Sequence, residues 1–166
     1  MHSSKPVLLA VAAFCIGLIG AALYLQLVEH MLPCPLCVLQ RYAFIAIALF
    51  CLIGAAMPRG TRRISIGFAT ASAVAGIGVA AKHLYVLANP GFSCGIDPLE
   101  TGLNKIFLAT WWPTLFRADG LCETPYPPTL GLSIPAWSMI GFLLVGFTLV
   151  FLFFTREKTG MFGKHR

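Results

Sequence analysis

Charged residues are scarce in this sequence, and acidic residues are the scarcest. Asp and Glu together number 6 among 166 residues, and the charged share of 11% stands against a hydrophobic share of 58%. Soluble domains carry roughly 25% charged residues, and a chain of this size folded in water could not hide so much apolar surface. The composition therefore excludes an ordinary soluble domain and indicates that lipid is the solvent.

Four apolar stretches are long enough to cross a bilayer, which takes about 20 helical residues. They cover residues of about 7–28, 38–57, 64–87 and 132–154. None has a charge in its middle, where a charge costs at least about 2.5 kcal/mol. The sequence therefore predicts an all-α membrane protein, in which residues 1–166 form one integral domain built on a bundle of four transmembrane helices.

The first stretch also has a basic residue in front of it, as a secretory signal does. Its apolar run of about 22 residues is longer than the 7–15 residue core of a signal peptide. No clear site with two small residues flanking a cleavage point follows before Cys34. We therefore expect residues 7–28 to be a retained span.

Basic residues predict the orientation of the four spans. The N-terminus, the loop at residues 58–63 and the C-terminal tail hold eight of the twelve Lys and Arg residues, against one acid, Glu157. The positive-inside rule places these segments in the cytoplasm. The loops at about residues 29–37 and 88–131 then face outward. This topology accounts for the basic residues without a nucleic-acid partner.

The second outer loop is long and rich in Pro and Gly. Its middle, residues 103–116, is aromatic and too short to span a bilayer, and it includes Trp111 and Trp112. We expect a short helix lying among the lipid headgroups. The alternative is a loop that packs on itself.

The six cysteines divide into two groups. Cys15 and Cys51 fall deep within spans, where unpaired cysteine behaves as a small hydrophobic residue. The other four fall in the outer loops and are Cys34, Cys37, Cys94 and Cys122. The outer side of a bacterial-type membrane is oxidising and permits disulfides, and four cysteines allow three pairings.

The Cys34-Pro35-Leu36-Cys37 segment can close on itself only as a tight loop, which is often redox-active. Pro35 suits the first position of a helix. Cys37 would then lie in the first turn of the second span, where the helix dipole favours its thiolate. Arg41 lies one turn further on the same face. An arginine inside a span is a candidate functional residue, although its side chain can also extend to the headgroups.

The four outer cysteines could also serve a metal site or a structural staple. Structural zinc sites commonly use two closely spaced cysteine pairs, but 27 residues separate Cys94 from Cys122. We therefore expect no metal. A purely structural disulfide between Cys94 and Cys122 remains an open alternative.

The sequence resembles the DsbB family, bacterial inner-membrane proteins that form disulfides with the help of quinone. The resemblance rests on Pro33 to Arg41, which contains the cysteine pair and the arginine, on Cys94 and Cys122, and on the segment 130–137 that opens the fourth span. It covers nearly the whole chain and implies a quinone-dependent oxidoreductase in the inner membrane, with both termini cytoplasmic and the active cysteines periplasmic.

The resemblance also implies an electron relay. A reduced thioredoxin-like partner, DsbA, attacks a Cys94–Cys122 disulfide at Cys94. Electrons then pass through a transient Cys34–Cys122 disulfide to the Cys34–Cys37 pair, and from Cys37 to a bound quinone, with ubiquinone preferred over menaquinone.

Three further residues are assigned to the quinone. The resemblance implies that Arg41 stabilises the Cys37 thiolate and the charge that develops on the quinone. It also implies that His83, at the outer end of the third span, lies near the quinone. Gln26 is a candidate donor to a quinone carbonyl.

Two rival functions remain from the sequence alone. The first is a non-catalytic four-span interaction protein whose disulfides only staple the outer loop. The second is a relay that carries reducing equivalents outward. It would need redox cysteines within reach of the cytoplasm, whereas Cys15 and Cys51 lie in mid-span.

Overall fold

The computed structural model describes residues 4–89, 101–120, 122 and 131–154. Its four long helices are α1 (Ser4–Val28), α2 (Pro35–Ala56), α3 (Arg59–Ala88) and α7 (Ile134–Phe154). All four are long and apolar enough to cross a membrane. The predicted all-α, four-span architecture is confirmed.

The first three long helices begin before the predicted apolar stretches because polar residues and prolines also adopt the geometry of a helix start, whereas α7 begins two residues after its predicted stretch. Pro35 occupies the first turn of α2 and Cys34 precedes it as the N-cap, so α2 begins three residues before the predicted span. Pro58 is the N-cap of α3, which therefore starts at Arg59. Proline suits these positions because its missing N–H would have no partner within the helix.

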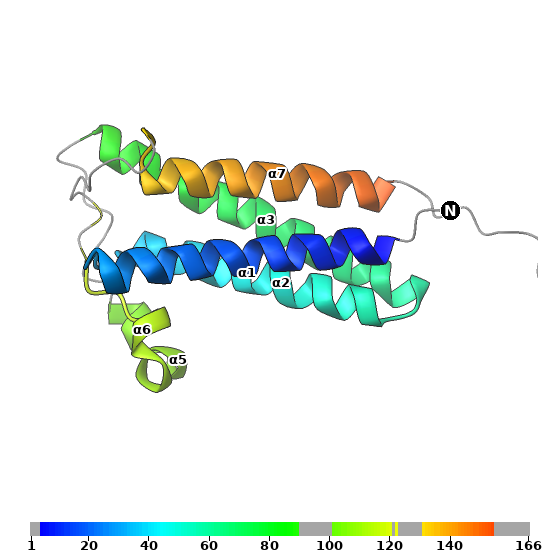
Figure 1. Ribbon diagram of the computed structural model, residues 1–166, viewed down its shortest axis with the longest axis horizontal. Coiled ribbons are helices and arrows are strands. Elements are labelled where there is room, and N and C mark those ends of the chain that lie inside the picture. Colours follow the sequence, from blue (N-terminus) through cyan, green and yellow to red (C-terminus); the bar gives the residue numbers. More distant parts are fainter. Residues whose placement is uncertain (1–3, 90–100, 121, 123–130, 155–166) are drawn as a thin grey trace, which may run out of the picture.

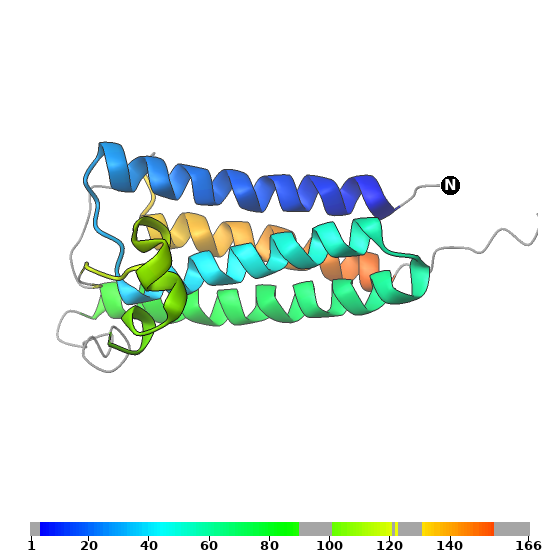
Figure 2. The same ribbon diagram turned by 90° about the horizontal axis from the view of Figure 1, so that it is seen from below.

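Consecutive long helices run antiparallel (Figures 1 and 2). The start of α1, the turn between α2 and α3 and the end of α7 lie at one end of the bundle. The opposite end carries the connection from α1 to α2, together with the short helices α5 (Phe107–Trp111) and α6 (Pro113–Phe116). Contacts follow the chain order, since α1 packs on α2, α2 on α3 and α3 on α7.

The bundle interior is apolar and draws side chains from all four long helices. Leu8, Ile47, Ala69 and Phe142 are fully buried within it. Cys15 of α1 and Cys51 of α2 are buried in the same cluster, which agrees with their interpretation as small hydrophobic residues. Large apolar side chains also cover the outside of the helices and are exposed in the isolated chain. Examples are Ile16, Phe68, Leu144, Phe147 and Phe151. Lipid would cover this surface.

Arg62 has a structural role in addition to its place among the basic residues that predict the orientation of the spans. It is buried, and its Nε donates to Gly54 O at 3.1 Å while one terminal nitrogen donates to Met57 O at 3.2 Å. These carbonyls lie at the C-terminal end of α2, where the last helical carbonyls lack intrahelical donors. The other terminal nitrogen donates to Ser4 Oγ at 3.3 Å. Arg62 therefore ties α1, α2 and α3 together at this end.

Gly76 allows α3 and α7 to approach each other. A Cβ at this position would lie 2.5 Å and 2.6 Å from two ring carbons of Phe142. That ring is fully buried and stacks on Phe44 with centroids 3.9 Å apart. We expect Gly76→Ala to lower the free energy of unfolding by about 1–3 kcal/mol, because overpacking forces a buried ring to move. Thermal unfolding in detergent measures the change.

Gly78→Ala is the matched control for Gly76→Ala. Gly78 is in the same helix, and a Cβ there would have nothing within 4 Å. Both substitutions gain helix propensity, by about 1 kcal/mol each. The packing argument is wrong if the two variants unfold at the same temperature.

The helix expected over residues 103–116 is interrupted. Trp112 has φ −136° and ψ 71° and separates α5 from α6. The residue before a proline avoids helical geometry, and Pro113 follows Trp112. The break at Trp112 therefore has a local cause that the sequence contains, and a second break lies at Lys105 and Ile106.

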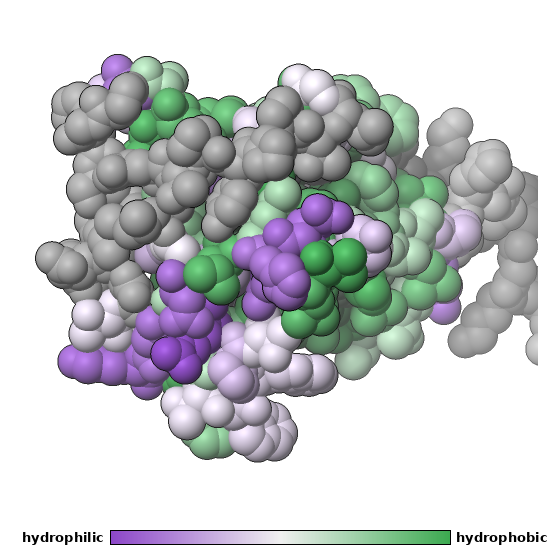
Figure 3. All heavy atoms as spheres, turned by 60° about the vertical axis from the view of Figure 1, so that its left-hand side comes forward, coloured by the Kyte–Doolittle hydropathy of each residue, from purple (hydrophilic) through white to green (hydrophobic). Residues whose placement is uncertain are grey.

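The segment around α5 and α6 has an inner and an outer face. Phe116 is buried and stacks on Tyr42 of α2 with centroids 4.8 Å apart. Phe107 and Trp111 are 71% and 75% exposed. Hydrophilic side chains gather at this end of the molecule, and the side of the bundle visible behind them is mainly hydrophobic (Figure 3). The segment packs on α2 and also presents aromatic rings outward, and its place among lipid headgroups stays a prediction.

Candidate redox site

Cys34 caps the helix that carries Cys37. Its backbone is extended, with φ −77° and ψ 165°, and its Sγ accepts a hydrogen bond from the Cys37 N–H at 3.2 Å. Pro35 opens the helix and Cys37 falls in the first turn, as predicted from the proline. The local sequence therefore positions both sulfurs at the N-terminus of α2, where the helix dipole favours negative charge.

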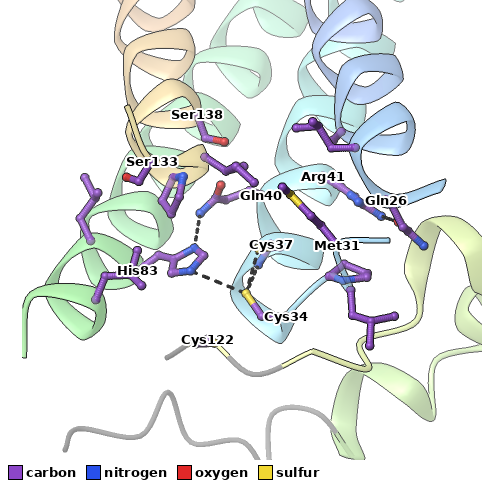
Figure 4. Close-up of a pocket in the computed structure, with 18 of the residues that line it drawn as sticks. Gln26, Met31, Cys34, Cys37, Gln40, Arg41, His83, Cys122, Ser133 and Ser138 are labelled. Atoms are coloured by element: carbon purple, nitrogen blue, oxygen red, sulfur yellow. Dashed lines mark hydrogen bonds between the residues drawn. The ribbon is translucent and has the colours of Figure 1, made fainter. Parts of the chain in front are cut away.

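The two sulfurs of this pair lie 2.8 Å apart, with the Cys34 thiol donating to Cys37 Sγ, and neither is in a disulfide (Figure 4). The side chain of Cys34 is only 3% exposed. The hydrogen bond to Cys37, and then burial, raise the pKa of the Cys34 thiol. In the reduced pair this direction favours the proton on Cys34 and any negative charge on Cys37.

His83 of α3 lies against this pair, with its Nε2 3.7 Å from Cys34 Sγ. The ring is buried, and its Nδ1 lies 3.3 Å from Nε2 of the buried Gln40. The structure thus brings the predicted residue His83 to the sulfurs. Gln40 was not predicted. Its spacing of three residues from Cys37, which puts both on one helix face, was the available signal.

Arg41 and Gln26 also meet, and both contact α6. Arg41 is 6% exposed, and its Nη1 donates to Gln26 Oε1 at 2.8 Å and to Leu115 O at 3.3 Å. Gln26 Nε2 donates to Thr114 O at 2.9 Å. Gln26 therefore orients the guanidinium and connects it to the second loop. The guanidinium is buried among these partners.

The second loop is attached to the first beside Cys34. The N–H groups of Asp119 and Gly120 both donate to Pro33 O, at 3.1 Å and 3.0 Å. A Cβ on Gly120 would overlap Leu32 O, so only glycine permits this approach. Nothing in the sequence marked Gly120, because its contact is with a residue far away along the chain.

This attachment places Cys122 next to the first cysteine pair. Cys122 is 1% exposed and shares an apolar cluster with Cys34, Leu36 and Val86. It is disulfide-bonded. Cys94 lies outside the described residues, so its pairing with Cys122 stays a prediction.

A cavity of about 450 Å³ joins these groups. Its polar lining comes from α1, α2 and α3 and from two serines of the α7 end, and it comprises Gln26, Cys34, Cys37, Gln40, Arg41, His83, Ser133 and Ser138 (Figure 4). Ile19 and Ala22 of α1 and Ile134 of α7 are part of the apolar remainder. The volume and the mixture of apolar walls with a few polar groups are typical of a small-molecule site.

The ligand atoms of Cys34, Cys37 and His83 lie within 4.8 Å of one another, close enough to be considered as metal ligands. Two thiolates on a tetrahedral zinc ion are about 3.7 Å apart, given Zn–S bonds of about 2.3 Å. The sulfurs here are at 2.8 Å, with a proton between them. The pair is close enough for sulfur exchange, and the expected absence of a metal stays a prediction.

Comparison with known proteins agrees with the site. The family profile described as "Disulfide bond formation protein DsbB" matches residues 4–152. The chain belongs to the DsbB family. This assignment agrees with the resemblance seen in the cysteine pair and Arg41.

Named relatives match along nearly the whole chain. "Disulfide bond formation protein B" of Herminiimonas arsenicoxydans is 52% identical over 158 residues, covering 95% of this chain and 100% of the relative. The protein of the same name from Ralstonia nicotianae is 47% identical over 156 residues, or 94% and 98% of the two chains. "Disulfide bond formation protein B 1" of Pseudomonas putida is 46% identical, over 87% and 86%. The chain is thus a multi-pass membrane protein of disulfide bond formation, a disulfide-forming oxidoreductase.

Proposed function

We propose that this protein reoxidises a periplasmic thioredoxin-like DsbA protein and passes the electrons through two cysteine pairs to a membrane quinone. One observation carries the proposal. Cys34, Cys37 and Cys122 meet at one end of the bundle, and Arg41 and His83 line the same cavity as these cysteines. A stapled interaction protein would need no such cavity beside its cysteines.

The first exchange takes place on the second loop. A thiolate of the reduced partner attacks Cys94 of a Cys94–Cys122 disulfide, forming a mixed disulfide and releasing the Cys122 thiolate. The second thiol of the partner then attacks its own mixed disulfide. The partner leaves oxidised, and Cys94 and Cys122 hold the two electrons as thiols.

The second exchange uses the proximity of Cys122 to Cys34. The Cys122 thiolate attacks Cys34 Sγ of a Cys34–Cys37 disulfide, forming a Cys34–Cys122 bond and releasing Cys37 as a thiolate. Cys94 then attacks Cys122, which restores the Cys94–Cys122 disulfide and leaves Cys34 reduced. The raised pKa of Cys34 keeps it protonated after release, so the back-reaction from Cys34 is slow.

The cavity fits a quinone by volume and by the placement of its polar groups. The cysteine sulfurs, Arg41 and His83 provide a polar end, and apolar side chains of α1 and α7 provide walls for an isoprenoid chain. When it is oxidised back to the disulfide, the Cys34–Cys37 dithiol would give up two electrons and two protons, which is the chemistry that a quinone held beside it would supply. In the chain itself, Cys37 presents the charged sulfur, Arg41 provides positive charge and Gln26 orients Arg41.

The proposed location is the bacterial inner membrane, with both termini in the cytoplasm and the cysteines in the periplasm. The beginning of α1, the α2–α3 turn and the end of α7 share one end of the bundle (Figure 1). The basic residues at the start of α1 and at the α2–α3 turn, which the positive-inside rule assigns to the cytoplasm, lie at that end. The cysteine site lies at the other end, where the compartment is oxidising.

A purified, detergent-solubilised protein tests the proposal. With a reduced thioredoxin-like partner and ubiquinone we expect catalytic turnover, seen as loss of quinone absorbance that matches the partner thiols consumed. Omitting quinone should stop the reaction after the first equivalents. Menaquinone in place of ubiquinone tests the expected preference. Thiol oxidation that proceeds equally well without any quinone would overturn the assignment.

A further inference from the structure

Gln40 is a buried amide with a specific neighbour. It lies on α2 between Cys37 and Arg41, and 4% of its side chain is exposed. Its Nε2 lies 3.3 Å from Nδ1 of His83, whose side chain is also 4% exposed. Buried amides and imidazoles need their hydrogen-bonding groups satisfied, so this contact constrains both side chains.

The contact selects one tautomer of the His83 ring. An amide nitrogen can only donate, so the Nδ1 that faces it must accept and carries no proton. A neutral ring then has its proton on Nε2. Nε2 is the nitrogen that lies 3.7 Å from Cys34 Sγ, so the N–H points at the redox sulfurs (Figure 4).

We propose that Gln40 is a positioning residue that holds His83 in the Nε2–H tautomer, so that a neutral donor faces the Cys34–Cys37 sulfurs when negative charge develops there. The proposal rests on the redox role of this pair. Gln40 touches the ring and acts through it. A ring with the opposite tautomer would present a lone pair to the sulfurs and repel that charge.

The charged and titratable groups around the His83 ring have other contacts or face away from it. Cys34 and Cys37 face it from the start of α2, and Arg41 acts on both sulfurs from one turn further along. Arg41 is also held by Gln26 and by carbonyls of α6. Lys82, the neighbour of His83 on α3, is exposed. A neutral N–H donor next to the sulfurs avoids the cost of burying a further charge.

Nitrogen NMR of protein labelled with ¹⁵N-histidine tests the tautomer directly. The His83 signal is the one lost in His83→Phe. In the reduced wild-type protein we expect Nε2 to be protonated and Nδ1 to be bare. Gln40→Met keeps the length of the side chain without a donor, and we expect both tautomers to appear. Gln40→Glu offers an acceptor, so we expect the proton to move to Nδ1.

Thiol reactivity gives the second readout. We expect Gln40→Met to slow alkylation of Cys37 in the reduced protein by about threefold to tenfold, because the loss of one hydrogen bond to the charged sulfur lowers the population of the reactive thiolate. In a His83→Phe background the same substitution should have no further effect, because Gln40 acts through the ring.

Two results would overturn the proposal. One is an Nδ1–H tautomer of His83 in the wild-type protein, which depends on the His83→Phe variant only for assigning the signal. The other is a Gln40→Met effect that persists without His83. Neither measurement uses quinone or the partner protein, so failure of the proposed relay and failure of this inference are distinguishable.

Discussion

Replacing Cys37 with serine is expected to lower the rate of quinone reduction by at least about a thousandfold, because a hydroxyl cannot form the disulfide that releases the electrons. Cys37 is the sulfur that accepts a hydrogen bond from the Cys34 thiol. Without it, Cys34 can only attack Cys122 of the Cys94–Cys122 disulfide, which breaks that bond, releases the Cys94 thiol and should let a Cys34–Cys122 disulfide accumulate. Quinone absorbance gives the rate, and mass spectrometry of non-reduced peptides detects the trapped bond.

Cys51→Ser is the control for Cys37→Ser. Cys51 is also on α2, buried in the apolar cluster away from the cavity, and a serine there can donate to a helical carbonyl. We expect this variant to retain most of the activity. The electron relay is contradicted if Cys37→Ser keeps more than about a tenth of the wild-type rate, because that residual rate exceeds what binding alone supplies once the reacting group is lost.

The second large effect is expected at Gly120. Gly120→Ala would place a Cβ against Leu32 O and break the bonds that Asp119 and Gly120 donate to Pro33 O. Cys122 would then move away from Cys34, and a displacement of about 1 Å can slow a reaction by about a hundredfold. We expect turnover with the thioredoxin-like partner to fall by about 10-fold to 100-fold.

A small dithiol separates this effect from general damage. Dithiothreitol reduces the Cys34–Cys37 pair without the second loop, so quinone reduction driven by dithiothreitol should be unchanged in Gly120→Ala. Gly102→Ala is the matched control, because a Cβ at Gly102 has nothing within 4 Å. Equal slowing with both electron donors would show that Gly120 supports the fold and not the transfer between cysteine pairs.

Local signals predicted the parts of the site that lie on one helix. Pro35 opens α2, and this proline alone was enough to predict Cys37 in the first turn and Arg41 on the same face. The break at Trp112 was missed, although Pro113 is a local signal for it. Helical periodicity and proline geometry depend only on neighbours in sequence, so these features needed no tertiary information.

The contacts between segments that are far apart in the chain could not be predicted from the sequence. The partners of Arg41 are Gln26 and the carbonyls of α6, and the partner of Gly120 is Pro33. A backbone carbonyl leaves no mark on the identity of its residue, so no pattern could have revealed these bonds. His83 was predicted only through the family resemblance.

By itself the sequence determined the solvent, the four spans and the place of the Cys34–Cys37 pair on one face at the start of α2, since hydropathy and a 3.6-residue period act locally. The tertiary structure decided which groups surround that pair. It brought His83 and Gln40 from different helices to within hydrogen-bonding distance, and it set Cys122 beside Cys34 through a glycine. Such contacts depend on how helices pack and on how loops return to the bundle, and packing joins residues that are distant along the chain.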